Sequence, residues 1–307
     1  MDLIRPSDLS DEQLDRILGG AERWLEHNRQ ADKASDLHRG SSVVLAFFEP
    51  STRTSLSFDM AAQRLGAMVT TLPVGMSSLA KGETLRDTAQ TIDAMQPDVL
   101  VIRHATPGAP EEVAAAMEAS VVNAGDGTGQ HPTQGLLDVA TIRHHFGQID
   151  GLTVAICGDI RHSRVANSTA ELLDRLGADV RLAGPARLMP DGHDGVDGID
   201  EAIAGADVVM MLRIQRERLG EDLGDAPGEY LDRYGLTAER FATAAKGAVV
   251  MHPGPMNRGV EIDGDLADSE ASLITLQVEM GVATRMAVLD LLIEDRRTDQ
   301  GDSPVAS

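Results

Sequence analysis

The sequence predicts an α/β protein of two domains, each a mostly parallel sheet flanked by helices, with interdomain helices joining them. Three observations lead to this fold class. Short apolar runs of β-type residues alternate with helical patterns along the chain, and parallel strands need such crossover connections. The 307 residues exceed the usual size of one hydrophobic core. A new strand–helix–strand pattern begins at Gly151, after a helix that ends near Gly147.

The expected strands are short apolar runs, and helical patterns lie between them. The strands are expected at residues 43–48, 99–103, 121–123, 153–157, 180–183, 208–212 and 249–251. The helices are expected at residues 54–65, 110–118, 135–145, 165–176, 199–204 and 273–294. Two stretches rich in Gly, Asp and Pro, residues 184–198 and 220–228, are expected to be surface loops. The polar tail, residues 297–307, is expected to be disordered.

The chain is strongly acidic, with 27 Lys and Arg against 49 Asp and Glu and a formal net charge of −22. Such a charge repels nucleic acid and anionic membranes, which bind proteins through Lys and Arg. Neither is therefore expected as a partner. Any cluster of Arg and Lys that binds an anion must act locally, inside a cleft.

Targeting features and cysteine usage predict a cytoplasmic protein. No apolar run reaches the roughly 20 residues that span a bilayer. Residues 1–6 carry no apolar stretch behind a basic head, so a signal peptide is not expected. The single cysteine, Cys157, lies in an apolar run and is expected to be a small core residue, which fits a reducing compartment.

Other enzyme classes fit this sequence less well. The β-α-β pattern of residues 153–185 suggests an NAD-binding oxidoreductase, but it lacks G-x-G-x-x-G and an acidic residue for the ribose. No G-x-x-x-x-G-K-[ST] motif is present for a P-loop NTPase. The nine histidines show no H-E-x-x-H spacing, so a metal site is not expected.

The segment 47–55 gives the strongest indication of a ligand site. It follows an apolar strand and opens an amphipathic helix, whose N-terminus presents unpaired N–H groups and a partial positive charge. Ser51, Thr52 and Thr54 add hydroxyl donors, and Arg53 adds a planar guanidinium suited to phosphate. A capped helix with a solvated Arg53 is the simpler interpretation. Four donors in one turn after an apolar strand favour an anion site instead, because α/β proteins place ligands there.

Residues 48–54 resemble the carbamoyl phosphate signature of the aspartate and ornithine carbamoyltransferase family. Further stretches similar to that family recur in order along the chain. They are Lys81-Gly82-Glu83-Thr84, Ile102-Arg103-His104, His131-Pro132-Thr133-Gln134, Gly158-Asp159 with Arg164, Arg213-Ile214-Gln215 and His252-Pro253-Gly254-Pro255. The resemblance implies that residues 1–134 bind carbamoyl phosphate and residues 135–283 bind aspartate. It also implies that the C-terminal helix 284–296 packs back on the first domain.

The resemblance implies roles toward carbamoyl phosphate for the matched residues. The expected catalytic residues are Arg53, Thr54 and His131, which point toward the carbonyl oxygen where negative charge develops. The full binding set is expected to be Ser51, Thr52, Arg53, Thr54, Arg103, His131, Gln134, Gly254 and Pro255. Gln134 and the carbonyl of Gly254 are expected to bind the carbamoyl NH2. Positioning and electrostatics carry such chemistry, so neither a metal nor another cofactor is expected.

The expected acceptor is L-aspartate, which makes the reaction a step of de novo pyrimidine biosynthesis. Ornithine enzymes generally read S-T-R-T-R and H-P-C-Q and carry a cysteine motif in the second domain, whereas this chain has Ser55, Thr133 and no cysteine at Gly254. Aspartate needs cations for its two carboxylates. The expected aspartate-binding residues are Lys81, Arg164, Arg213 and Gln215. Another amino-acid acceptor, such as ornithine, is the alternative.

The family also implies an oligomer. In relatives, the loop equivalent to residues 74–82 reaches into the neighbouring subunit's active site. Ser77 and Lys81 are therefore expected to act in the neighbouring subunit of a homotrimer with shared active sites, with Ser78 as the alternative to Ser77. The sequence leaves open whether Arg258 contacts aspartate. It also leaves open whether regulatory or dihydroorotase chains complete a larger assembly.

Overall fold

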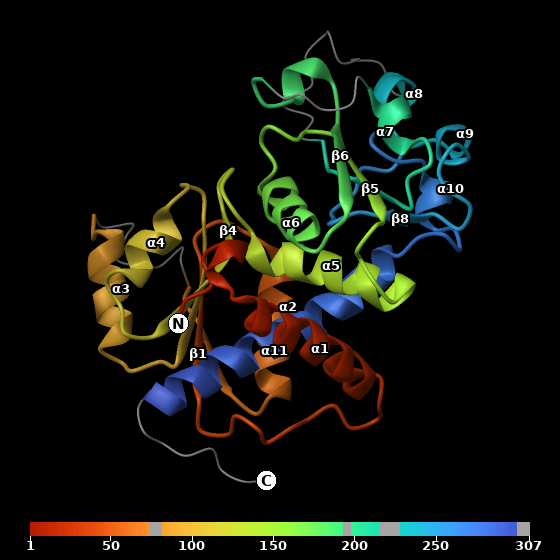
Figure 1. Cartoon of the computed structure of the whole chain (residues 1–307). Helices are drawn as coiled ribbons and strands as arrows, with labels where there is room; N and C mark the ends of the chain where they lie inside the picture. Colours follow the sequence, from red (N-terminus) through yellow and green to blue (C-terminus); the bar gives the residue numbers. More distant parts are fainter. Residues whose placement is uncertain (74–81, 193–197, 215–227, 300–307) are drawn as a thin grey trace. The chain divides into compact units, whose positions relative to one another are not determined.

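The computed structural model describes residues 1–73, 82–192, 198–214 and 228–299 (Figure 1). The chain folds as two compact units, Met1–Ala140 with Glu279–Ser307, and Thr141–Val278. Two long helices, α5 (Pro132–Phe146) and α11 (Ile274–Asp299), contain the points where the chain passes from one unit to the other. The domain boundaries expected from the sequence, 134/135 and 283/284, also lie within these helices.

The first unit is built on a four-stranded parallel sheet with strand order β2-β1-β3-β4. Its strands are β1 (Ser42–Phe47), β2 (Met68–Thr71), β3 (Val99–His104) and β4 (Ser120–Asp126). Apolar runs in the sequence predict β1, β3 and β4 but not β2. Strand β2 lies at the edge of the sheet and is mostly exposed, so it carries neither the apolar run nor the alternation of the buried strands.

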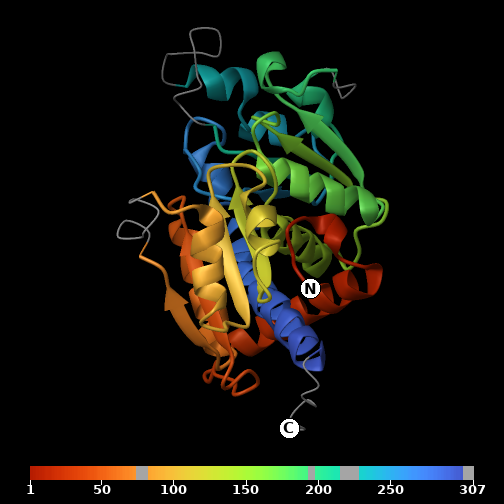
Figure 2. The same ribbon diagram turned by 90° about the vertical axis from the view of Figure 1, so that its left-hand side faces the viewer.

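Helices cover both faces of this sheet (Figures 1 and 2). Helices α3 (Leu85–Asp93) and α4 (Ala109–Ala114) cover one face, where Ile92 and Val113 pack with Leu100 and Ile102. Helices α2 (Thr52–Arg64) and α11 lie on the other face. Helix α1 (Asp11–Asn28) follows a short 3-10 turn, η1 (Pro6–Asp8), and begins with a capping box between Ser10 and Gln13.

The second unit repeats the architecture with strand order β6-β5-β7-β8, again all parallel. Its strands are β5 (Thr153–Cys157), β6 (Asp179–Ala183), β7 (Val208–Met211) and β8 (Val249–Met251). Its helices are α6 (Arg164–Arg175), α7 (Ile199–Ile203), α8 (Glu229–Tyr234), α9 (Ala238–Phe241) and α10 (Gly264–Ala267), with a 3-10 turn, η4 (Ala186–Leu188). The predicted fold class is therefore confirmed: each unit has a parallel sheet flanked by helices.

Two expectations about irregular segments need correction. The tail expected to be disordered from residue 297 is helical as far as Asp299, because α11 continues and Arg297 donates a hydrogen bond to Ser41 Oγ at 3.0 Å. The stretch 184–198 is not wholly a surface loop, since η4 buries Leu188. The other expected loop, residues 220–228, lies outside the described residues except for Gly228. None of the helices within the described ranges is long and apolar enough to cross a membrane.

The placement of Cys157 in β5 gives a first prediction. Its side chain is fully buried, and burial raises the pKa of the thiol to about 12. At pH 8 only roughly one part in ten thousand is then the reactive thiolate. We expect a water-soluble thiol reagent to label no cysteine in the native protein and one per chain in urea, with Cys157→Ala giving the background. Labelling of the native protein within minutes would contradict this placement.

Candidate functional site

The predicted anion-binding residues of the first unit converge on one edge of its sheet. In the parallel register Phe47 pairs with Arg103 and His104 pairs with Asp126, so β1, β3 and β4 end side by side. Residues 51–54 follow β1, Arg103 lies at the end of β3, and His131 follows β4. Ligands of α/β proteins bind at this carboxyl edge. The fold therefore gathers segments that lie far apart in the sequence.

The N-terminus of α2 has the features of an anion site. Ser51 is the N-cap residue, and its side chain makes no capping hydrogen bond. The first intrahelical bond of the turn is donated by Ser55 N to Ser51 O at 3.1 Å, so the N–H groups before it have no intrahelical acceptor. Thr52 and Arg53 are exposed to solvent, whereas Thr54 is buried. The turn thus offers backbone, hydroxyl and guanidinium donors together.

Arg103 is held at the same edge by an acidic neighbour. Its Nε donates a hydrogen bond to Glu49 Oε1 at 3.1 Å, and its Nη1 donates to the carbonyl oxygen of Ala124 at 3.4 Å. The Arg103 side chain is only 12% exposed. Glu49 lies in the signature segment but was given no role from the sequence. The ion pair fixes the orientation of the guanidinium plane at this sheet edge.

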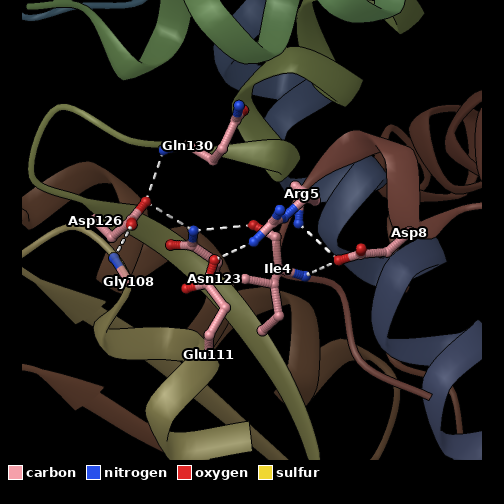
Figure 3. A network of polar contacts seen from close by, with 8 residues as sticks. All are labelled: Ile4, Arg5, Asp8, Gly108, Glu111, Asn123, Asp126 and Gln130. Carbon is pink, nitrogen blue, oxygen red and sulfur yellow. Dashed lines mark hydrogen bonds and ion pairs between the residues drawn. The ribbon is translucent and has the colours of Figure 1, made fainter.

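A buried polar network shapes the loop that precedes His131 (Figure 3). The carboxylate of Asp126 accepts hydrogen bonds from Gly108 N at 2.9 Å, Gln130 N at 2.7 Å and Asn123 Nδ2 at 2.9 Å. Asn123 Nδ2 also donates to the carbonyl oxygen of Ile4 at 3.0 Å. Three donors from separate segments thus meet on one carboxylate. The network fixes the backbone of the residue directly before His131.

The start of α5 carries the next predicted residues. His131 and Gln134 are both nearly buried, at 3% and 8% exposure, and Gln134 N donates to His131 O at 2.9 Å. The Gln134 side chain donates from Nε2 to Asp138 Oδ1 at 3.0 Å. Asp138 was not predicted as a site residue. Its spacing of four residues from Gln134 places both side chains on one helix face, which is the signal that could have identified it.

The predicted aspartate-binding residues of the second unit also follow strand ends. Arg164 is the first residue of α6 after β5, and Arg213 is an exposed residue directly after β7. The two strands are hydrogen-bonded neighbours, and Leu212 N donates to Cys157 O at 2.8 Å. Gly158 permits this approach: it has φ +134°, and a Cβ there would lie 3.1 Å from Leu212. The two arginines therefore extend from adjacent strands at one edge.

Gly254 and Pro255, predicted to bind carbamoyl phosphate, follow β8 in this second unit. The preceding His252 is fully buried and receives a hydrogen bond on Nδ1 from Gly254 N at 2.8 Å. Its Nε2 must then carry the proton, and it donates to the buried Glu261 Oε1 at 3.2 Å. His252 N donates to Gln277 Oε1 at 2.9 Å. This network holds the backbone of the 252–255 segment, and nothing in the sequence indicated the part played by Glu261.

Other residues singled out from the sequence are not part of these two sheet edges. Ser77, Ser78 and Lys81 belong to residues 74–81, and Gln215 belongs to residues 215–227, both outside the described residues. Arg258, whose role was left open, forms a two-pronged ion pair with Asp268 at 2.6 and 2.7 Å. No group of three or more His, Cys, Asp or Glu side chains suited to a metal ion occurs within the described part of the chain.

Comparison with known proteins places both units in one family. A sequence model of the carbamoyl-P binding domain of aspartate/ornithine carbamoyltransferases matches residues 1–144, and one of their Asp/Orn binding domain matches residues 150–292. The chain is 54% identical to the aspartate carbamoyltransferase catalytic subunit of Gluconobacter oxydans, over 94% of each chain. It is 50% identical to that of Granulibacter bethesdensis, over 99% of this chain and 100% of the relative.

Solved structures agree with these matches. Aspartate transcarbamoylase from Trypanosoma cruzi, in complex with carbamoyl aspartate and phosphate, is 32% identical with a TM-score of 0.83, covering 94% of this chain and 95% of the other. The same enzyme with carbamoyl phosphate and aspartate is 31% identical with a TM-score of 0.82, over 94% and 95% of the two chains. The catalytic subunit of M. Jannaschii aspartate transcarbamoylase is 33% identical with a TM-score of 0.81, over 96% and 98%.

The Asp126 network gives a prediction about the loop before His131. Because both carboxylate oxygens of Asp126 accept hydrogen bonds, Asp126→Asn must turn an NH2 group toward at least one donor. We expect the displaced His131 to weaken carbamoyl phosphate binding by roughly tenfold, with little change for inorganic phosphate, in calorimetric titrations.

Asp93→Asn is the matched control for this experiment. Asp93 caps Glu118 N and Ala119 N in the same unit, but it uses only Oδ1, at 3.0 Å to each, so asparagine can keep both bonds. We expect its affinities to equal those of the parent. Equal affinities in the Asp126→Asn protein would show that the network does not position His131.

Proposed function

The chain belongs to the aspartate/ornithine carbamoyltransferase family, and we infer that it transfers the carbamoyl group of carbamoyl phosphate to the amine of L-aspartate, giving N-carbamoyl-L-aspartate and phosphate. One observation carries this function. The chain is 54% identical to an aspartate carbamoyltransferase catalytic subunit. Hydrogen-bond donors suited to phosphate lie at the carboxyl edge of the first sheet, and Arg164 and Arg213 lie at the carboxyl edge of the second.

The first unit is assigned to the carbamoyl phosphate. The N-terminus of α2 with Ser51, Thr52 and Arg53 holds the phosphate, and Arg103 supplies a second guanidinium. Arg53, Thr54 and His131 direct donors at the carbonyl oxygen. When the amine attacks the carbonyl carbon, negative charge grows on that oxygen and then on the departing phosphate. Fixed donors stabilise both charges without moving.

The second unit is assigned to the acceptor. Arg164 and Arg213 bind the two carboxylates of aspartate, with Gln215 and Lys81 assisting, and Gly254 and Pro255 contact the carbamoyl group. The attacking amine must be neutral, so it loses one proton before attack and another as the C–N bond forms. The departing phosphate is a base close enough to accept the second proton. Ornithine fits less well because its cationic side chain would face arginines rather than acids.

We further place this reaction in de novo pyrimidine biosynthesis and in the cytoplasm, and we propose a homotrimer with shared active sites. Exposed apolar side chains on α2 and β2 support an oligomer. Leu56 and Met60, 55% and 43% exposed, lie one turn apart on α2, and Met68, 61% exposed, begins the edge strand β2. Ser77 and Lys81 follow this strand in sequence. Regulatory or dihydroorotase chains are candidate further partners.

Parallel assays with aspartate and ornithine test the reaction. We expect carbamoyl transfer to aspartate and none to ornithine. Arg53→Ala should lower kcat by a factor on the order of 10² to 10³, because one oxyanion donor is lost. Arg39→Ala is the matched control, since Arg39 is an exposed arginine before the opposite end of the same strand, and its kcat should equal the parent's. Activity with ornithine alone would refute the acceptor.

Subunit mixing tests the shared sites. Arg53→Ala and Lys81→Ala chains are expected to be nearly inactive alone. If each site takes Arg53 from one subunit and Lys81 from its neighbour, a random 1:1 hybrid trimer regains about a quarter of the parent activity, because one arrangement in four restores both side chains. Light scattering confirms the trimer mass. A hybrid of trimer mass that stays inactive would refute sharing.

A further inference from the structure

Gln134 and Asp138 form a buried pair in the first unit whose geometry determines how one amide faces. They lie one turn apart on α5, with 8% and 0% of their surfaces exposed. Gln134 Nε2 donates to Asp138 Oδ1 at 3.0 Å. An ionised carboxylate only accepts hydrogen bonds, so it selects the amide orientation in which NH2 faces Asp138. The carbonyl oxygen of Gln134 is then directed away from the carboxylate.

We propose that Asp138 is a positioning residue that turns Gln134 Oε1 toward the carbamoyl NH2 and so selects carbamoyl phosphate over acyl phosphates that lack an N–H donor. This inference rests on the proposed function. The opposite amide orientation would set two oxygens against each other at Asp138 and two NH2 groups against each other at the substrate. Both contacts are unfavourable in a buried site, where an unmatched polar pair is costly.

A cation in the same buried region keeps this carboxylate available as an acceptor. Arg285 on α11 is 4% exposed, its guanidinium lies 5.1 Å from the centroid of the Phe58 ring, and its Nη1 donates to Gly281 O at 3.0 Å. Burial lowers the pKa of Arg285 to about 10, and the charge of Asp138 acts in the opposite direction. The guanidinium therefore stays charged at neutral pH and favours ionised Asp138.

The positive charge of Arg285 also offsets the repulsion between Asp138 and the phosphate of the substrate. A lone carboxylate behind Gln134 would repel the phosphate of the substrate, and an unpaired charge of either sign is costly in the interior. Asp138 and Arg285 together add no net charge to the region. The chain can thus use a carboxylate to orient an amide beside an anion site. A neutral acceptor at position 138 could rotate and present a donor instead.

Acetyl phosphate is the probe for this selection, because it replaces the carbamoyl NH2 with a methyl group of similar size. The measured quantity is the ratio of its inhibition constant to the KM for carbamoyl phosphate. In Asp138→Ala we expect KM for carbamoyl phosphate to rise about tenfold, the inhibition constant for acetyl phosphate to stay within twofold, and the ratio to fall accordingly. Asp138→Asn keeps an oxygen acceptor and should lower the ratio by a smaller factor, about threefold.

A double-mutant cycle separates positioning from a general structural effect. If Asp138 acts through Gln134, then Asp138→Ala should leave the ratio unchanged in a Gln134→Ala background. Asp290→Ala is the matched control, because Asp290 also accepts a side-chain hydrogen bond in this unit, from His38 Nε2 at 2.8 Å, and its loss should lower stability but keep the ratio.

Two results overturn the inference: an unchanged ratio in Asp138→Ala, or an equal fall in the ratio with and without Gln134. If Asp138→Ala does not fold, the same ratio is measured in Asp138→Asn. A ratio equal to the parent's in that variant also overturns the inference. Carbamoyl transfer by the parent protein is measured first. A parent without that activity refutes the proposed function, whereas an active parent with an insensitive ratio refutes only the role of Asp138.

Discussion

Parallel strand pairing is the constraint on which the described structure depends. Each strand of both sheets runs in the same direction as its neighbours, so within each unit all strands end at one edge. The segments after β1, β3 and β4 must therefore converge, although almost 80 residues separate Arg53 from His131. The same constraint collects Arg164, Arg213 and Gly254 in the second unit. Chemistry at these edges follows from topology before any side-chain contact is considered.

Apolar runs in the sequence predicted the buried strands of both sheets, and the residues expected to meet a ligand stay predictions. Buried strands such as β3 show as continuous apolar runs, whereas the exposed edge strand β2 has no such pattern and was not predicted. Helix α1 was also not predicted, although Leu14, Ile17, Leu18 and Leu25 have helical spacing and are buried.

The supporting side chains were harder to predict, for a physical reason. Asp126 and Glu261 accept hydrogen bonds from backbone N–H groups. Some of these donors come close only in the folded chain, such as Gly108 N, which donates to the Asp126 carboxylate. Such contacts leave no periodicity in the sequence. Asp138 differs, because its partner lies four residues away on the same helix, where spacing alone indicates contact. Residue spacing could therefore have indicated the local pair of Gln134 and Asp138, whereas it carries no signal for long-range polar contacts.

Acids lie beside the expected ligand-binding residues of the first unit, although the chain binds anions and already carries a net charge of −22. Glu49 holds Arg103, Asp126 fixes the loop before His131, and Asp138 orients Gln134. The charge of each acid, taken alone, lowers the positive potential that an anion would meet. Each also fixes a donor or acceptor before the substrate arrives. Fixed dipoles stabilise developing charge without reorganisation, whereas tight binding of the ground state alone does not accelerate a reaction. Acids that orient donors and acceptors in this way therefore suit a catalyst better than a store for phosphate.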